Sequence, residues 1–413
     1  MKTVHFYFQL PIFTVLFFSL LNCSGPESGS EQRNPSEISG PMRNEMLGKT
    51  VYEWTHEEKV LGFRNIADLW NTRSIESGYD SSVLPHNTNT DLLSLTFEFK
   101  DSTYSFDEFI AHNQPLGLLV IKNGEVVLEK YAQGNTPQSK WISFSVAKSV
   151  VSLLVGAAVK DGLVTNLDAP ITTYLPELAG SSYEDVSLWH TMQMASGVKW
   201  DENYNDPESD IRQFVPIQGM AGMLEYVKNL PRVAPPGERF NYNTAETRLV
   251  GMALRSAIGE DLSAYLSRKV WVPFGMESDA NWWLLSEGGV ESGGCCISAT
   301  LRDYGRIGLF TLSELRGSPS YQRVLPEGWI EKTTAPSKGA DYYGALWWPD
   351  YGLDGNRTFA AYGIFGQMIW VDPTENLVVV THSAWPESLG KEGENYHAIN
   401  AAFARAVAET LRE

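Results

Sequence analysis

Ser145 and Lys148 stand three residues apart at the start of a long uncharged segment, and together they could form an activated nucleophile. Residues 149–159, SVVSLLVGAAV, predict a helix that is buried on all sides. Side chains at i and i+3 share a helix face, so the hydroxyl and the amine can come within hydrogen-bonding distance. Desolvation lowers the pKa of a lysine, and a neutral amine is the base that a serine nucleophile needs.

The same Ser-x-x-Lys spacing occurs twice more, at Ser196/Lys199 and Ser388/Lys391, beside glycines in segments that predict loops. Only the first pair begins a helix. A structural alternative remains for it, in which the lysine extends to solvent and the serine merely caps the helix.

Tyr242 lies in RVAPPGERFNYNTAETRLVGMAL, after a Pro/Gly turn and before a helix capped near Asn243 or Thr244. A tyrosine beside a neutral lysine can be held as a phenolate or can relay a proton. Packing at a turn is the commoner fate of a tyrosine, and this alternative stays open.

The segment FAAYGIFGQMIWVDP contains a Gly-x-x-Gly step, from Gly363 to Gly366, at the start of a strand. Glycine in this position permits close approach of a substrate. The N–H of Ile364 could therefore join that of Ser145 as an oxyanion donor. The alternative is a β-bulge without a function.

Composition excludes several classes of protein. The chain has 413 residues, 43% of them hydrophobic, and a formal charge of −18, which argues against nucleic acid as a partner. The seven histidines form no close pair with metal-ligand spacing, and CxxC and HExxH are absent. We therefore predict neither a metal nor a cofactor. Cys295 and Cys296 are adjacent, and we expect small packing residues there rather than a strained redox pair.

The N-terminus is typical of an exported protein. An apolar run from Phe6 to Leu21 follows a basic start and leads to Cys23. The run is too short for a transmembrane helix, and SLLNC resembles a bacterial lipoprotein box, with Asn22 as an imperfect residue before the cysteine. We expect residues 1–23 to be a lipoprotein-type export signal, with an ordinary secretory signal as the alternative. The expected location is the cell envelope, with the membrane reached only through a lipid anchor at Cys23, and otherwise the periplasm or the medium.

Residues 24–45 are rich in Ser, Gly, Pro and Glu and predict a flexible tether. Beyond it, strand signals lie at both ends of the chain. Residues 117–134 and 367–384 each predict a hairpin, and residues 394–412 predict an amphipathic helix. Further helices are expected near 145–160, 185–195, 220–229, 244–258 and 300–315. This order predicts an α+β fold, in which an antiparallel sheet built from both termini carries a helical insertion and brings residues 120 and 370 close together.

Three segments in order, SFSVAKS, PPGERFNYNT and AAYGIFGQMIWVDP, resemble the motifs of the serine β-lactamase-like hydrolases. This superfamily includes class C β-lactamases, DD-peptidases, family VIII-type esterases and 6-aminohexanoate-dimer (nylon oligomer) hydrolases, and the motifs are most similar to the last branch. VSLWHTMQMASGVKWDENY and GGCCISATLRDYGRIGL resemble its non-catalytic segments, so the likeness runs from about residue 100 to the C-terminus. It implies an α/β/α sandwich of the β-lactamase/transpeptidase type over residues 46–413, with a helical subdomain at about 160–290.

The resemblance also implies roles for single residues. Ser145 would be the acylated nucleophile, Lys148 its base and Tyr242 the proton shuttle to the leaving group. The N–H groups of Ser145 and Ile364 would form the oxyanion hole. Residues expected to contact the substrate are Tyr204, Thr244, Tyr362 and Gly363, with Trp282 and Trp283 as further candidates, although such aromatic residues are more often core.

The sequence departs from the family pattern in two places. Thr244 replaces the Asn of the usual Tyr-x-Asn motif, and the third motif, usually Lys-Thr-Gly or His-x-Gly, is Ala361-Tyr362-Gly363 without a cation. That cation helps to hold the carboxylate of β-lactams and peptidoglycan stems. Its loss favours an ester or amide that lacks this carboxylate.

The sequence thus predicts a cofactor-free serine hydrolase that cleaves a small-molecule carboxylic ester or amide through an acyl-enzyme. Absence of GxSxG counts against an α/β-hydrolase. One alternative is a true β-lactamase or DD-peptidase, and another is a catalytically silent binding protein of the cell envelope. Nothing in the sequence indicates the oligomeric state.

Overall fold

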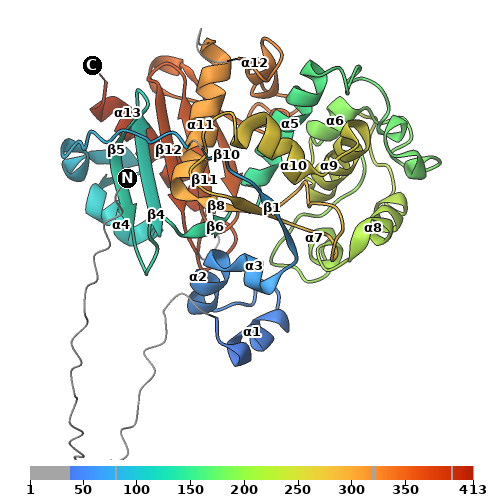
Figure 1. Ribbon diagram of the computed structural model, residues 1–413, viewed down its shortest axis with the longest axis horizontal. Coiled ribbons are helices and arrows are strands. Elements are labelled where there is room, and N and C mark those ends of the chain that lie inside the picture. The colour runs from blue at the N-terminus through green and yellow to red at the C-terminus, as the bar shows by residue number, and fades with distance from the viewer. Residues whose placement is uncertain (1–37, 80, 318–321, 392–393, 413) are drawn as a thin grey trace, which may run out of the picture. The chain divides into compact units, whose positions relative to one another are not determined.

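An antiparallel sheet assembled from both ends of the chain organises the fold of the computed structural model (Figure 1). The structure describes residues 38–79, 81–317, 322–391 and 394–412. The large sheet has the order β5-β4-β12-β11-β10-β9. Its strands are β4 (Gly117–Lys122), β5 (Glu125–Tyr131), β9 (Trp348–Tyr351), β10 (Arg357–Gly363), β11 (Gln367–Asp372) and β12 (Leu377–His382). Val120 and Trp370 both pair with Val379, which confirms the predicted closeness of residues 120 and 370.

Helices cover both faces of this sheet, and the alternation of side chains along the strands explains why. Leu119 and Ile121 of β4 belong to one buried cluster with α11 and α5, whereas Leu118 and Val120 belong to another with α13 and α4. Successive residues of a strand point to opposite faces, so a strand that is apolar throughout needs cover on both sides. The result is the predicted α/β/α sandwich, with α13 and α4 on one side and α11 and α5 on the other (Figure 1).

The predicted helices are confirmed near their expected bounds, and others join them. Helices before the large insertion are α1 (Gly40–Leu47), α2 (His56–Arg64), α3 (Ile66–Leu69), α4 (Phe106–Asn113) and α5 (Val146–Lys160). Those that follow are α6 (Leu188–Met192), α7 (Asp210–Phe214), α8 (Gly219–Lys228), α9 (Thr244–Ile258), α10 (Leu262–Leu266), α11 (Leu301–Arg316), α12 (Trp329–Thr333) and α13 (Tyr396–Thr410). Helix α9 packs against both α5 and α6, and so attaches the helical insertion to the rest of the fold. The boundaries of about 160 and 290 for a helical subdomain stay a prediction.

A second sheet, of order β1-β7-β8-β6, leads directly to the Ser145 segment. Its strands are β1 (Thr72–Ile75), β6 (Lys140–Ile142), β7 (Ala280–Trp283) and β8 (Ile297–Thr300), and a separate hairpin joins β2 (Thr96–Phe99) to β3 (Ser102–Ser105). Strand β6 ends at Ile142, three residues before Ser145, and pairs with β8. The N–H of Ser143 donates to the carbonyl of Ile297 over 2.7 Å, which continues the pairing up to the start of α5.

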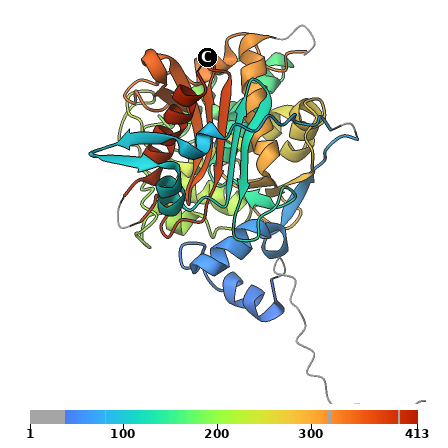
Figure 2. The same ribbon diagram turned by 90° about the vertical axis from the view of Figure 1, so that its left-hand side faces the viewer.

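Helices α1–α3, at the bottom of Figure 2 in blue, precede the segments that carry the motifs. Helix α1 begins at Gly40, so the last six residues of the predicted tether are helical. The expected export signal, Cys23 and residues 24–37 of the tether lie outside the described residues. Within the part of the chain that is described, no helix is long and apolar enough to cross a membrane.

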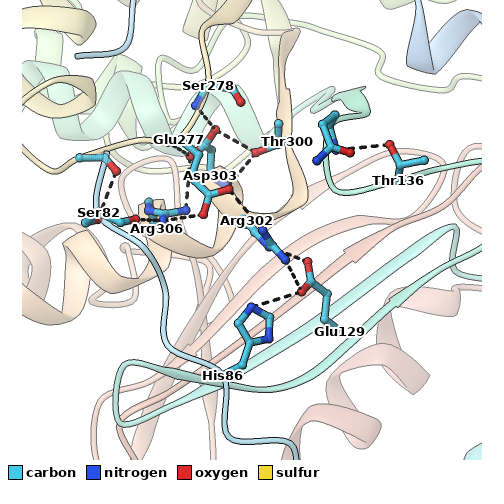
Figure 3. Close-up of polar contacts among 12 residues, drawn as sticks. Ser82, His86, Glu129, Thr136, Glu277, Ser278, Thr300, Arg302, Asp303 and Arg306 are labelled. Atoms are coloured by element: carbon cyan, nitrogen blue, oxygen red, sulfur yellow. Dashed lines mark hydrogen bonds and ion pairs between the residues drawn. The ribbon is translucent and has the colours of Figure 1, made fainter. Parts of the chain in front are cut away.

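An ion-pair network ties α11 to strand β5 and to the segment before β7 (Figure 3). Arg306 of α11 is 1% exposed and pairs with Glu277 at 2.8 Å and Asp303 at 3.6 Å. Asp303 accepts a hydrogen bond from the N–H of Glu277 at 2.7 Å. Arg302 forms two hydrogen bonds, of 2.8 and 2.9 Å, with the carboxylate of Glu129. Arg302, Asp303 and Arg306 belong to the segment that resembles the family's non-catalytic motif, and their contacts give that segment a structural role.

Replacing Asp303 with Ala is expected to destabilise the fold by about 3–5 kcal/mol, because it removes one partner of a buried ion pair. The carboxylate also accepts from the hydroxyl of Thr300, the N-cap of α11, at 2.8 Å. Arg412→Ala is the control, since Arg412 pairs with Asp354 at the surface and its side chain is 38% exposed. The control should cost less than about 1 kcal/mol. Urea unfolding of both variants measures the difference, and equal losses would contradict a structural role for this network.

Candidate active site

Ser145 is the only residue of 141–158 that is not fully buried, and it lies where β6 gives way to α5. It occupies the N-cap position of α5, but its side chain makes no capping hydrogen bond. The structural alternative for this serine is therefore excluded. Phe144 before it has a positive φ of 44°, which is unusual for a residue with a Cβ and typical of strained turns at functional sites.

Lys148 points inward rather than to solvent. Its side chain is buried, with the residue 2% exposed, and its Nζ lies 2.9 Å from Ser145 Oγ. Two further hydrogen bonds fix the amine, one to Thr244 Oγ1 at 3.1 Å and one to the carbonyl of Gly294 at 2.7 Å. Among the residues that the structure describes, no carboxylate forms an ion pair with Lys148.

The surroundings of Lys148 favour its neutral form. The pKa of Lys148 is lowered to about 7, mainly by burial; the carboxylate of Glu202 opposes this shift and the positive charge of Arg248 adds to it. The amine thus exchanges its proton near neutral pH, as a general base requires. The partial positive charge at the N-terminus of α5 acts in the same direction.

Tyr242 lies beside this pair, as predicted. Lys148 Nζ is 5.3 Å from the centre of its ring, and the ring stacks against Trp348 with centroids 5.6 Å apart. Burial raises the pKa of Tyr242 above its ordinary range, and a hydrogen bond with Ser145 only partly offsets this. The phenol therefore stays protonated at neutral pH and is a proton donor rather than a phenolate.

Thr244 and Glu202 form a shell behind Lys148. Thr244, expected at the substrate, both accepts a hydrogen bond from Lys148 and donates one to Glu202, and it also lines the pocket. The carboxylate of Glu202 accepts from the N–H of Thr244 at 3.0 Å and from the side chains of Trp200 and Tyr204 at 2.5 and 2.8 Å. Glu202 was not among the predicted site residues, although a carboxylate in WDENY, two residues before the predicted pocket residue Tyr204, was an available signal.

The N–H groups expected to bind an oxyanion are free to do so. Neither Ser145 N–H nor Ile364 N–H donates a hydrogen bond within the described part of the chain. Ile364 lines the same pocket as Ser145. Gly363 explains how β10 comes so close, because a Cβ there would lie 2.3 Å from the carbonyl oxygen of Ser143. Buried N–H groups without partners are rare and call for a ligand or water.

A pocket of about 530 Å³ opens in front of Ser145, a size typical of small-molecule sites. Tyr204 and Trp283 line it, as predicted. Trp282 does not: it is fully buried and donates to the carbonyl of Ser292 at 2.9 Å. Tyr362 is also not a lining residue, and its ring packs against His397 at 4.6 Å, on the α13 side of the sheet. The expectation that Tyr362 contacts the substrate is therefore not supported.

Residues outside the predicted motifs complete the wall of the pocket. Tyr52, Trp70 and neighbouring residues of the N-terminal helical segment line it, and Tyr52 stacks on Tyr204 with centroids 5.8 Å apart. Cys295 and Cys296 line it as well, and their two sulfur atoms lie against each other. Cys296 has a positive φ of 128°, which is unusual for a residue with a Cβ.

An antiparallel sheet between helical layers, with a Ser-x-x-Lys pair at the start of a buried helix, is the arrangement expected from the resemblance to the serine β-lactamase-like hydrolases. The chain belongs to the Beta-lactamase family, whose model matches residues 106–403. It is 28% identical over 317 residues to a 6-aminohexanoate-dimer hydrolase of Paenarthrobacter ureafaciens, covering 71% of this chain and 78% of the relative. Family and relative together identify it as a serine hydrolase of amide or ester bonds.

Solved structures agree with this fold. A protein from Bacillus anthracis assigned as a 6-aminohexanoate-dimer hydrolase superposes with a TM-score of 0.76 at 19% identity, over 88% of this chain and 95% of that one. The octameric penicillin-binding protein homologue from Pyrococcus abyssi gives a TM-score of 0.57 at 18% identity, over 73% and 75%. At such identities the likeness concerns the fold alone.

Activity is expected to rise with pH and level off above neutrality, because only the neutral form of Lys148 can accept the proton of Ser145. With a pKa of about 7 the amine is neutral in about a tenth of the molecules at pH 6 and in about nine tenths at pH 8. The measurement is kcat/KM for a neutral ester between pH 5.5 and 8.5, which reports the pKa of the free enzyme. Loss of the negative charge in Glu202→Gln should move the inflection to lower pH. A profile that is flat across this range would rule out Lys148 as the titrating base.

Proposed function

We propose that the chain hydrolyses carboxylic ester or amide bonds of small molecules through an acyl-enzyme on Ser145. One observation carries the proposal: a buried amine without a carboxylate partner lies 2.9 Å from the hydroxyl of the one partly exposed residue in its segment. Burying a charged ammonium group without a counter-charge costs free energy, whereas a neutral amine in that place can accept the proton of the serine hydroxyl.

Acylation begins when Lys148 Nζ accepts the proton of Ser145 Oγ while the oxygen attacks the substrate carbonyl. The carbonyl oxygen becomes an oxyanion, and the N–H groups of Ser145 and Ile364 are free to donate to it. Removing one such donor in a hydrolase typically costs about 3–4 kcal/mol of transition-state stabilisation. Tyr204 and Trp283 are among the aromatic side chains that line the pocket, and hydrogen bonds to an oxyanion strengthen where a bound substrate displaces water.

The leaving group then needs a proton, and Tyr242 is placed to give it. Its phenol is protonated at neutral pH and hydrogen-bonds with Ser145, so it can pass a proton to the departing alcohol or amine. The Lys148 ammonium returns the proton to the phenolate. In deacylation the neutral amine of Lys148 takes a proton from water as the water oxygen attacks the acyl-enzyme carbonyl, and the Lys148 ammonium gives that proton to Ser145 Oγ as the acid leaves.

Two observations favour a reaction of the nylon-oligomer-hydrolase or esterase type. The relative at 28% identity is named a 6-aminohexanoate-dimer hydrolase, which is an amide hydrolase. The third motif also lacks the cation that β-lactams and peptidoglycan stems engage. Turnover of a chromogenic cephalosporin in preference to p-nitrophenyl butyrate and linear amides would instead identify a β-lactamase or DD-peptidase.

Ser145→Ala should abolish labelling by a fluorophosphonate probe and reduce ester hydrolysis to background, because the nucleophile is lost. Lys148→Ala should lower kcat by about 10²–10⁴-fold while the fold is retained. Lys199→Ala is the matched control, since Lys199 belongs to another Ser-x-x-Lys sequence and is exposed in a loop. A fully active Lys148→Ala would disprove the base assignment. If the native protein were not labelled and turned over no ester, amide or β-lactam, a binding function would be favoured.

We also propose that the chain is exported and anchored through a lipid on Cys23. The apolar run from Phe6 to Leu21 and the cysteine that follows support this. Full-length protein produced in a bacterial host should incorporate an alkyne-bearing fatty acid and sediment with membranes, and Cys23→Ser should abolish both. Ser24→Ala is the neighbouring control. Equal membrane association of the two variants would contradict a lipid anchor.

A further inference from the structure

Arg248 is a buried cation in the pocket that the proposed mechanism does not use. It lies on α9 four residues after Thr244, on the same helix face, and both side chains line the pocket. The residue is 1% exposed, and its guanidinium carbon lies near two aromatic rings, 4.9 Å from the centre of Phe214 and 5.2 Å from that of Trp283.

No carboxylate of the described residues forms a salt bridge with this guanidinium, although the charge of Glu202 acts on it from a greater distance. The other fully buried arginine, Arg306, pairs with Glu277 and Asp303, but Arg248 forms no ion pair within the described residues. Its Nε has no hydrogen-bond partner, and its Nη1 meets only the sulfur of Met223, at 3.5 Å. An unpaired buried charge costs several kcal/mol, so a partner supplied from outside the chain would explain it.

The other charged groups of the pocket are already engaged. Glu53 accepts from the N–H and hydroxyl of Thr50, and Lys49 pairs with two glutamates. Arg212 lies 4.6 Å from the ring of Tyr52 and donates to the carbonyl of Tyr204 at 3.0 Å. In a chain of formal charge −18, Arg248 thus provides a local positive site enclosed by aromatic walls.

The aliphatic stem of Arg248 lies close to the residues that hold Lys148. A Cβ on Gly294 would be 3.3 Å from Arg248 Cγ, so the arginine stem packs against this glycine. The carbonyl of the same glycine accepts the hydrogen bond of Lys148 at 2.7 Å. A substrate whose anionic group binds Arg248 would therefore need only a short linker between that group and the carbonyl that Ser145 attacks.

We propose that Arg248 binds a carboxylate of the substrate, so that the natural substrate is an ester or amide that carries a carboxylate a short distance from the scissile bond. This inference rests on the proposed function of the same pocket. A guanidinium matches a carboxylate in shape and can bind it with two parallel hydrogen bonds. The missing cation of the third motif led us to expect a substrate without a carboxylate, but α9 supplies a cation from a different element.

Binding to the Ser145→Ala protein tests this without turnover. The probes are 6-acetamidohexanoate and its neutral carboxamide, which differ only in the terminal group, and calorimetry gives both dissociation constants. We expect the carboxylate to bind at least about tenfold more tightly, as a charge-assisted pair of hydrogen bonds implies. Adding Arg248→Met should bring the ratio to within about twofold, and Arg248→Lys should retain part of it.

Arg212→Met in the same background is the matched control, because it removes another pocket arginine and should leave most of the preference. If the Ser145→Ala protein binds the two probes equally, the inference is overturned, whether or not the Arg248→Met variant folds. It is also overturned if the carboxylate is still preferred after Arg248 has been replaced. Turnover of neutral esters without any carboxylate preference would overturn this inference alone. A carboxylate preference that depends on Arg248 in a protein without turnover or labelling would support the site and refute the proposed hydrolysis.

Discussion

The structure of the site depends on one buried amine that lacks a counter-charge. Lys148 is held by a hydroxyl of the nucleophile, a threonine hydroxyl and a backbone carbonyl, all of them uncharged acceptors. A carboxylate at any of these positions would stabilise the ammonium form and remove the base. The carboxylate of Glu202, whose charge raises the pKa of Lys148, accepts a hydrogen bond from Thr244 rather than from the amine. The apolar face of α5 and the neutral acceptors therefore both favour the uncharged form of Lys148.

The groups that the sequence could predict are those whose geometry is local. Ser145 and Lys148 are one helical turn apart, so the start of α5 alone brings them together. The hairpins β4–β5 and β11–β12 follow from turn residues and strand patterns, and they determine most of the large sheet. Strand parity, in contrast, was overlooked: Tyr362 and Gly363 are neighbours on β10 and cannot both face the pocket. The glycine approaches Ser143, which leaves the tyrosine on the α13 side.

The groups that the sequence could not predict come from segments positioned only by tertiary packing. Glu202 lies in a loop before α7, and the carbonyl of Gly294 lies in a turn before β8, far along the chain from Lys148. Tyr52 and Trp70 precede the residues that match the family, so no motif pointed to them. They nevertheless form a wall of the pocket. Chemistry in this chain comes from the family core, whereas part of the shape that selects a substrate comes from the N-terminal helices.

Burial in the same apolar surroundings leaves a lysine and an arginine in different charge states. Burial lowers the pKa of both Lys148 and Arg248, to about 7 and to about 10. Because the guanidinium starts from a much higher value, it remains charged at neutral pH, while the amine is uncharged in a large share of the molecules. One dry pocket can thus contain a proton acceptor and an anion receptor at the same time. The charge on Arg248 also disfavours a second positive charge nearby, so the receptor helps to keep the base neutral. An exchange of the two side chains would lose both functions, since a buried arginine could not accept the proton and a buried lysine would lose much of its charge.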